Sequence, residues 1–144
     1  MNCDEFILQM KSHGAMLAPG ANARAIAIAN STLQNMRVAT LPKFMIDFYT
    51  QCSAMNLGSG YIFGPTQVKR GTKYPIPSLV EINAGLTGFP KLRGKTVSGR
   101  NDLFWFAFDA FGNCFMLDNT NLNCLRQYDD AYRAMTDCLV AGKL

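Results

Sequence analysis

The chain lacks most of the residue patterns by which a catalytic or metal centre is recognised from sequence. It contains one histidine, His13, and its five cysteines include no Cys-x-x-Cys pair. Zinc centres are built from such closely spaced cysteine and histidine ligands, so we expect no metal site. Neither Gly58-Ser59-Gly60 nor Lys69-Arg70-Gly71 has the spacing of a phosphate-binding loop, and we expect no cofactor.

Long apolar runs are also absent. The longest, Leu103–Phe108, is far shorter than the ~20 residues that a membrane-spanning helix needs. The first residues, Met1-Asn2-Cys3-Asp4-Glu5, are acidic where a secretory signal is basic, and no apolar core follows them. We therefore expect a cytoplasmic protein that makes no contact with a membrane.

A chain of this length needs neither disulfides nor metals to hold it together. At 144 residues, 49% of them hydrophobic, it can bury roughly 68–70% of its unfolded surface as one domain spanning residues 1–144. Most cysteines fall on predicted apolar faces, where a reduced, buried thiol is the ordinary state. The cysteines concerned are Cys3, Cys52, Cys114, Cys124 and Cys138.

Aromatic residues are concentrated between residues 102 and 119. Two apolar runs in this stretch, Leu103–Phe108 and Cys114–Leu117, flank five residues of turn type, which predicts a β-hairpin. Neither face of the first run is polar. Its strand is therefore expected inside the sheet, with Trp105 and Phe106 both mostly buried.

Apolar residues recur at helical spacing in several other segments. The predicted helices are 4–12, 21–37, 40 to about 55, and 130 to about 141. Thr40 is expected to cap the third helix, with Pro42 in its first turn, and Asp129 is expected to cap the last.

Residues 56–100 are rich in glycine and proline, which is typical of short strands and loops. Tyr61-Ile62-Phe63 is the clearest strand, 78–83 suits a single helical turn, and 92–97 fits either structure. A third strand is expected over 122–128, after the hairpin. Helices first, strands in the middle and a helix last predict an α+β fold, in which helices cover an antiparallel sheet.

Three short motifs accompany this order of elements. They are Leu41-Pro42-Lys43-Phe44-Met45-Ile46-Asp47-Phe48-Tyr49, Asp109-Ala110-Phe111-Gly112-Asn113 and Tyr128-Asp129-Asp130. Together they resemble the SUKH superfamily, the homologues of the yeast cell-wall glucan-synthesis regulator. The resemblance covers about residues 18–141 and leaves 1–17 as an N-terminal extension of one SUKH-like domain. It departs from the family at Asn56-Leu57-Gly58-Ser59-Gly60, where Asn-Gly-Gly is frequent.

The resemblance implies an α+β fold and a protein that is not an enzyme. Bacterial members commonly serve as immunity proteins that bind and block polymorphic toxins, and fungal members act in cell-wall regulation. The family has no shared catalytic residues, so the resemblance assigns none to this chain.

Two groups of residues keep an enzyme among the hypotheses. His13 would form a Cys–His pair if the fold brought Cys3 or Cys52 to it, although no nucleophile signature surrounds either cysteine. Paired carboxylates would serve acid–base chemistry or cation binding. The aspartates nevertheless suit turns, strand ends and a helix cap, which is the structural interpretation. They are Asp102, Asp109, Asp118, Asp129 and Asp130.

Charge is distributed unevenly along the chain, whose total is +4. Between residues 69 and 100 there are seven basic residues and one acidic residue, Glu81, a net charge of +6. The basic residues are Lys69, Arg70, Lys73, Lys91, Arg93, Lys95 and Arg100. They suit an acidic protein surface or a nucleic-acid backbone, unless they form only a solvated loop face. Protein is favoured over nucleic acid because only Tyr74 and Phe89 are placed to stack on bases.

We therefore expect a protein-binding domain without catalytic activity, which serves as the immunity member of a toxin–immunity pair. Its contact surface would be the loops of residues 56–100, since recognition usually sits on loops held by a rigid scaffold. The alternatives are a regulatory scaffold of the cell-wall type, a small enzyme, and a nucleic-acid binder that uses the basic segment 69–100.

Overall fold

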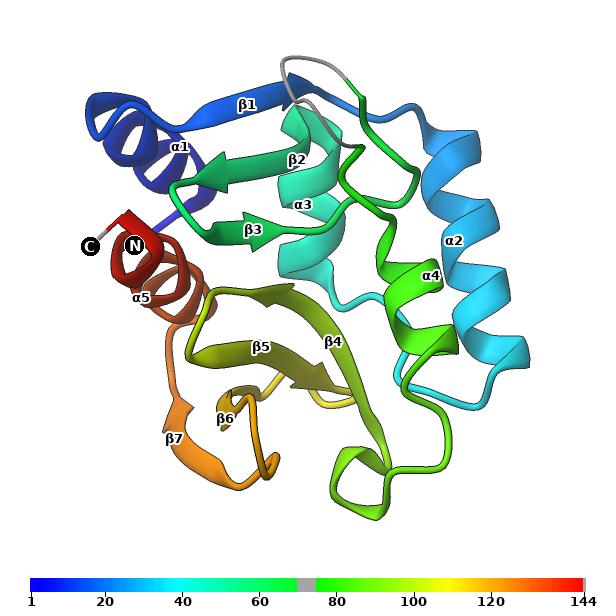
Figure 1. Ribbon diagram of the computed structural model, residues 1–144. Helices are drawn as coiled ribbons and strands as arrows, with labels where there is room; N and C mark the ends of the chain where they lie inside the picture. Colours follow the sequence, from blue (N-terminus) through cyan, green and yellow to red (C-terminus); the bar gives the residue numbers. More distant parts are fainter. Residues whose placement is uncertain (70–74, 144) are drawn as a thin grey trace.

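The fold is built on one antiparallel sheet whose seven strands lie side by side in the order of the sequence (Figure 1). The computed structural model describes residues 1–69 and 75–143. The strands are β1 (Met16–Pro19), β2 (Cys52–Leu57), β3 (Gly60–Ile62), β4 (Lys95–Arg100), β5 (Phe104–Asp109), β6 (Cys114–Asp118) and β7 (Cys124–Tyr128). With the helices that pack on this sheet, they form a single α+β domain, as the sequence predicts.

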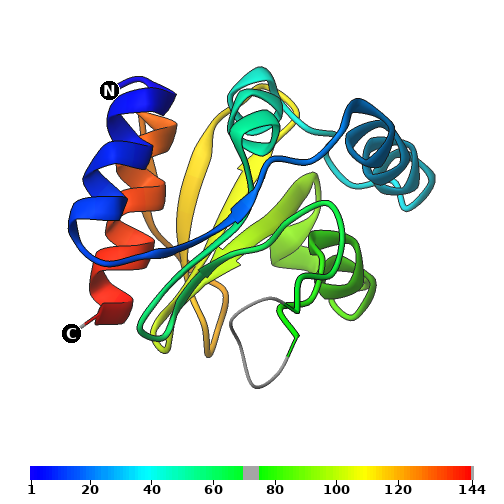
Figure 2. The same ribbon diagram turned by 90° about the horizontal axis from the view of Figure 1, so that it is seen from above.

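Five α-helices accompany the sheet in the described residues. They are α1 (Cys3–Ser12), α2 (Ala23–Asn35), α3 (Lys43–Gln51), α4 (Leu79–Ala84) and α5 (Ala131–Lys143), and a 3₁₀ turn, η1 (Pro90–Leu92), precedes β4. Helix α5 crosses the sheet and contacts β2 to β7, and α1 lies beside it. Helices α2 and α4 lie together at the opposite end of the molecule (Figures 1 and 2).

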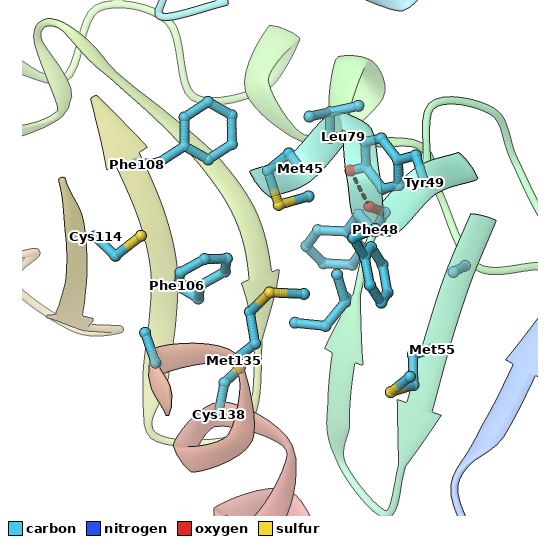
Figure 3. Packing of buried hydrophobic residues seen from close by; sticks show 14 of the residues in the cluster. Met45, Phe48, Tyr49, Met55, Leu79, Phe106, Phe108, Cys114, Met135 and Cys138 are labelled. Carbon is cyan, nitrogen blue, oxygen red and sulfur yellow. Dashed lines mark hydrogen bonds between the residues drawn. The ribbon is translucent and has the colours of Figure 1, made fainter. Parts of the chain in front are cut away.

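Aromatic rings join three helices to one face of the sheet. The rings of Phe44 in α3 and Phe108 in β5 meet edge to face at 6.1 Å. Phe6 in α1 lies 5.9 Å from Phe48 in α3 and 5.5 Å from Tyr132 in α5. Burial of large rings contributes strongly to stability, so this layer forms the main core, which Figure 3 shows from close by.

The predicted hairpin lies inside the sheet, because β5 pairs with β4 and β6, and β6 pairs in turn with β7. Phe106 has no exposed surface and packs on the helix-covered face. Trp105, on the opposite face, keeps part of its surface exposed. The turn between the two strands lies where the sequence predicts it. Gly112 has the positive φ, 84°, that this turn requires.

The third helix ends earlier than its apolar spacing predicts. Helix α3 stops at Gln51, and the next residues, predicted to continue it to about 55, form β2 instead. Cys52 and Met55 are fully buried as expected, but on a strand. Thr40 does not cap this helix. Pro42 occupies the capping position, without a side-chain bond.

Further differences concern both ends of the chain. The stretch 14–20, predicted only as a break after the first helix, contains β1, which pairs with β2. At the other end, the backbone amides of Tyr132 and Arg133 donate to the carboxylate of Asp130. Asp130, not Asp129, therefore caps α5, and the helix extends past 141 to Lys143.

Candidate functional site

The α4–β4 segment, residues 85–94, carries two of the predicted partner-binding residues and leads into β4, which carries two more. Lys91 and Arg93 are exposed on the segment, and Lys95 and Arg100 stand at the two ends of β4. Lys69 is exposed on the loop after β3. Arg70 and Lys73 lie outside the described residues.

A buried amide fixes α4 against β4. The side chain of Asn83, only 4% exposed, accepts from the Val97 backbone N–H at 2.9 Å and donates to the Val97 carbonyl at 2.7 Å. The amide thereby bonds both polar groups of Val97 as a neighbouring strand would. Because these bonds are buried and fully paired, the segment between α4 and β4 starts and ends on rigid structure.

A second tie joins β4 to the loop after α2. The Thr96 hydroxyl, which is fully buried, donates to the Ala39 carbonyl at 2.6 Å. This contact connects residues 57 positions apart in sequence. It brings the end of α2 to the start of β4, where Arg93 and Lys95 lie.

The end of α2 adds a basic residue that the charge pattern did not single out. The Val38 N–H bonds to the Leu33 carbonyl, and the Arg37 N–H bonds to the Gln34 carbonyl, which together form a Schellman motif. Arg37 occupies its left-handed position with φ at 61°, where glycine is usual. No signal in the sequence marks this residue as part of a basic surface formed with the α4–β4 segment.

A cavity lies between the end of α2 and the α4–β4 segment. Its volume is about 230 Å³, and its described lining contains three basic residues and no acidic one. Its lining is Met36, Arg37, Val38, Asn83, Leu86, Thr87, Gly88, Phe89, Pro90, Leu92, Arg93, Gly94 and Lys95. We call it the basic cavity. Phe89, 49% exposed, adds an accessible aromatic ring to this site.

The basic residues around the cavity differ in the contacts that they make within the chain. Lys91 donates to the Asn121 carbonyl at 3.0 Å and to the Asn123 side chain, so its ammonium turns toward the β6–β7 loop. The Lys95 ammonium lies 5.0 Å from the centre of the Phe115 ring, and Arg100 stacks on Trp105 at 4.7 Å. Arg37 and Arg93 take part in none of the ion pairs found among the described residues.

The residues that would serve an enzyme, such as His13 and Cys52, have other roles in the fold. His13 follows α1 as its C-cap residue and is half-exposed. Cys52 is fully buried, and burial raises the pKa of its thiol to about 11, which disfavours the nucleophilic thiolate. Within the described residues, no group of three or more histidines, cysteines, aspartates or glutamates is placed to hold a metal ion.

Two of the aspartates support turns, as the structural interpretation predicts. The Asp109 carboxylate accepts from the backbone amides of Phe111 and Asn113, both at 2.9 Å, and from the Asn113 side chain at 3.0 Å. Partial burial acts to raise its pKa, but these hydrogen bonds outweigh it and hold the pKa below its ordinary value. Asp118 accepts from the amides of Thr120 and Asn121 in the next turn.

The described helices include none that is both long enough and apolar enough to span a bilayer. Comparison of the chain with protein-family models, with curated proteins and with solved structures gave no match to any of them.

Proposed function

We propose that this chain is a non-enzymatic, protein-binding domain that acts as an immunity protein, neutralising a polymorphic toxin by covering it. The resemblance of its motifs to the SUKH superfamily supports the toxin–immunity role. The α4–β4 segment and the basic cavity are the surface that binds the partner.

One observation carries this proposal. Two exposed arginines from distant parts of the sequence, Arg37 and Arg93, line one cavity together, with the exposed ring of Phe89 beside them. Arginine and aromatic side chains are the residue types most enriched among those that dominate binding energy at protein interfaces. The rigid supports at Asn83 and Thr96 hold this surface in place before binding, which lowers the entropy lost on association.

The surface also specifies the charge of its partner. A partner that meets the basic cavity must present an acidic patch, because like charges brought together across an interface oppose association. A basic toxin, such as one that approaches nucleic-acid phosphates, would have to bind elsewhere on the chain.

If a neighbouring gene encodes a polymorphic toxin, titration of that toxin with the chain tests this proposal. A covering inhibitor should reduce the toxin's activity linearly, to zero at one equivalent, and the two proteins should co-elute as a complex. Growth of cells that produce the toxin should recover when the chain is co-expressed.

The shape of that titration separates the candidate classes. Complete loss of toxin activity at a small fraction of an equivalent would mean that the chain is an enzyme that modifies the toxin. Unaltered toxin activity and separate elution at several equivalents would reject the immunity role.

A further inference from the structure

We infer that the basic cavity is a carboxylate-binding pocket, in which Arg37 and Arg93 hold an acidic group of the protein partner. This inference rests on the proposed protein-binding function and names the chemistry of its contact. It follows from the backbone of Arg37, the size of the cavity and the geometry of the guanidinium group.

The backbone of Arg37 is in a conformation that its residue type disfavours. A side chain at positive φ brings Cβ close to the carbonyl oxygen, and glycine avoids this contact at the ends of helices. Among the described residues, only Arg37 and Leu122 are non-glycine residues at positive φ. Leu122 is half-buried and packs against the core, whereas Arg37 is exposed. Strained backbone of this kind concentrates at functional sites.

The volume of the cavity limits what can occupy it. Sites for cofactors and drug-sized ligands measure about 300–1,000 Å³, whereas the basic cavity measures about 230 Å³. One acidic side chain, or the carboxylate at the end of a chain, suits the smaller volume.

The side chains favour a carboxylate. A guanidinium group binds both oxygens of a carboxylate through two parallel N–H···O bonds, so each of the two arginines is suited to hold an acidic group that enters the cavity. Neither Arg37 nor Arg93 is occupied by a carboxylate among the described ion pairs. Phe89 and Pro90 add apolar surface to the lining, and this surface can pack on the methylene groups of an acidic side chain.

Titration of the isotope-labelled chain with short peptides, followed by its amide NMR spectrum, tests the inference. A hexaglutamate peptide with an amidated C-terminus presents side-chain carboxylates only. A glycine–serine peptide with a free C-terminus presents a terminal carboxylate only. Saturable shifts at the amides of Arg37, Gly88 and Gly94 with either peptide are expected, in the millimolar range of a single pocket. The peptide that produces them identifies the source of the carboxylate, and no shifts with either peptide would overturn the pocket.

Substitution of Arg37 separates its binding role from a structural role. Arg37→Gly should raise the melting temperature by about 3 °C, because the backbone strain is relieved, and weaken peptide binding about tenfold. Arg37→Lys keeps the charge but loses the bidentate geometry, so it should bind more weakly than the wild type and more tightly than Arg37→Gly, at an unchanged melting temperature. Arg24→Gln, an equal loss of charge on the exposed start of α2, is the matched control and should bind as the wild type does.

Several outcomes contradict the inference. Undiminished peptide binding by Arg37→Gly would show that Arg37 does not contact the carboxylate. An equal loss in Arg24→Gln would show that only the total charge of the chain matters. Tighter binding of a single-stranded RNA oligonucleotide than of either peptide, with the same amides shifting, would assign the surface to nucleic acid.

Failure of the pocket and failure of the immunity role give different results. If the chain neutralises the toxin but binds neither peptide, the immunity role is supported and the carboxylate pocket is rejected. If the chain binds a peptide through Arg37 but leaves the toxin active, the carboxylate pocket is supported and the immunity role is rejected.

Discussion

At the scale of single residues, four of the five cysteines are core side chains. Cys3, Cys52, Cys114 and Cys138 are buried, and only Cys124 is exposed. Burial raises the pKa of the Cys114 and Cys138 thiols to about 12, so almost no thiolate is present at neutral pH. Such thiols pack as small apolar groups and are poor nucleophiles.

Thiol labelling of the native protein follows from this burial. At pH 8, a reagent such as 5,5′-dithiobis(2-nitrobenzoate) should modify one thiol per chain rapidly, and all five in denaturant. Cys124→Ser should abolish the fast reaction in the native state. A second thiol that reacts at a similar rate would show that part of the core opens readily to solvent.

Two phenylalanines of the hairpin differ in burial and therefore in their expected contribution to stability. Phe106 is fully buried, and Phe106→Ala should reduce the free energy of unfolding by roughly 3–5 kcal/mol, measured by denaturant titration. Phe111 is 90% exposed at the turn, and Phe111→Ala should change the same free energy by less than about 0.5 kcal/mol. An unchanged midpoint for Phe106→Ala would mean that β5 is not the centre of the core.

At the scale of elements, the sequence predicts best where one periodicity is unambiguous. The stripe of α2 and the aromatic run of β5 are such cases, and both elements form where expected. The stretch 52–57 is ambiguous, because Cys52 and Met55 continue the helical spacing of α3 while the run also suits a strand buried on both faces. Pairing of β2 with β1 and β3, which the local pattern does not show, decides for the strand.

The turn between β5 and β6 should make stability depend on pH. The folded pKa of Asp109 lies below its ordinary value of 3.8, so folding favours the carboxylate. Its contribution to stability is therefore present at neutral pH and is lost as the pH falls below about 4. Between pH 6 and pH 3, the unfolding midpoint of Asp109→Asn should fall less than that of the wild type.

A matched aspartate controls for the general effect of acid on the fold. Asp102→Asn removes an exposed carboxylate just before β5 and should keep the pH dependence of the wild type. If Asp109→Asn lost stability in acid as steeply as the wild type, the hydrogen bonds of the turn would not be what lowers the pKa of Asp109.

At the scale of the whole molecule, the basic segment of the sequence and the lining of the basic cavity share two residues, Arg93 and Lys95. The density of basic residues in the sequence points to both of them, since charge is visible without structure. Arg37 is far from them in the sequence and comes near them in the fold, where the hydrogen bond between Thr96 and Ala39 joins the loop after α2 to β4. The sequence likewise gave no sign that Lys91 and Lys95 are engaged by the β6–β7 loop and by Phe115.

This difference changes which substitution best tests the basic surface. Changing Lys91, Arg93 and Lys95 together to glutamate would also remove the contacts that the two lysines make within the chain. A loss of binding could then come from lost recognition or from local unfolding. Arg93→Glu alone reverses an exposed charge that lines the basic cavity. Arg24→Glu is its control, with the same change of charge at the start of α2, away from the cavity lining.

The rate of association with an acidic protein partner should report this charge directly. At low salt, Arg93→Glu should slow association by about 3–10-fold, because a basic surface steers an acidic partner over long distances. The difference should nearly vanish at 1 M salt, where the Debye length is about 3 Å. Stopped-flow measurements at several salt concentrations would give both rates. Equal slowing by Arg24→Glu would place the effect in the overall charge of the chain, and an unaltered rate for Arg93→Glu at low salt would mean that the basic cavity is only a solvated face.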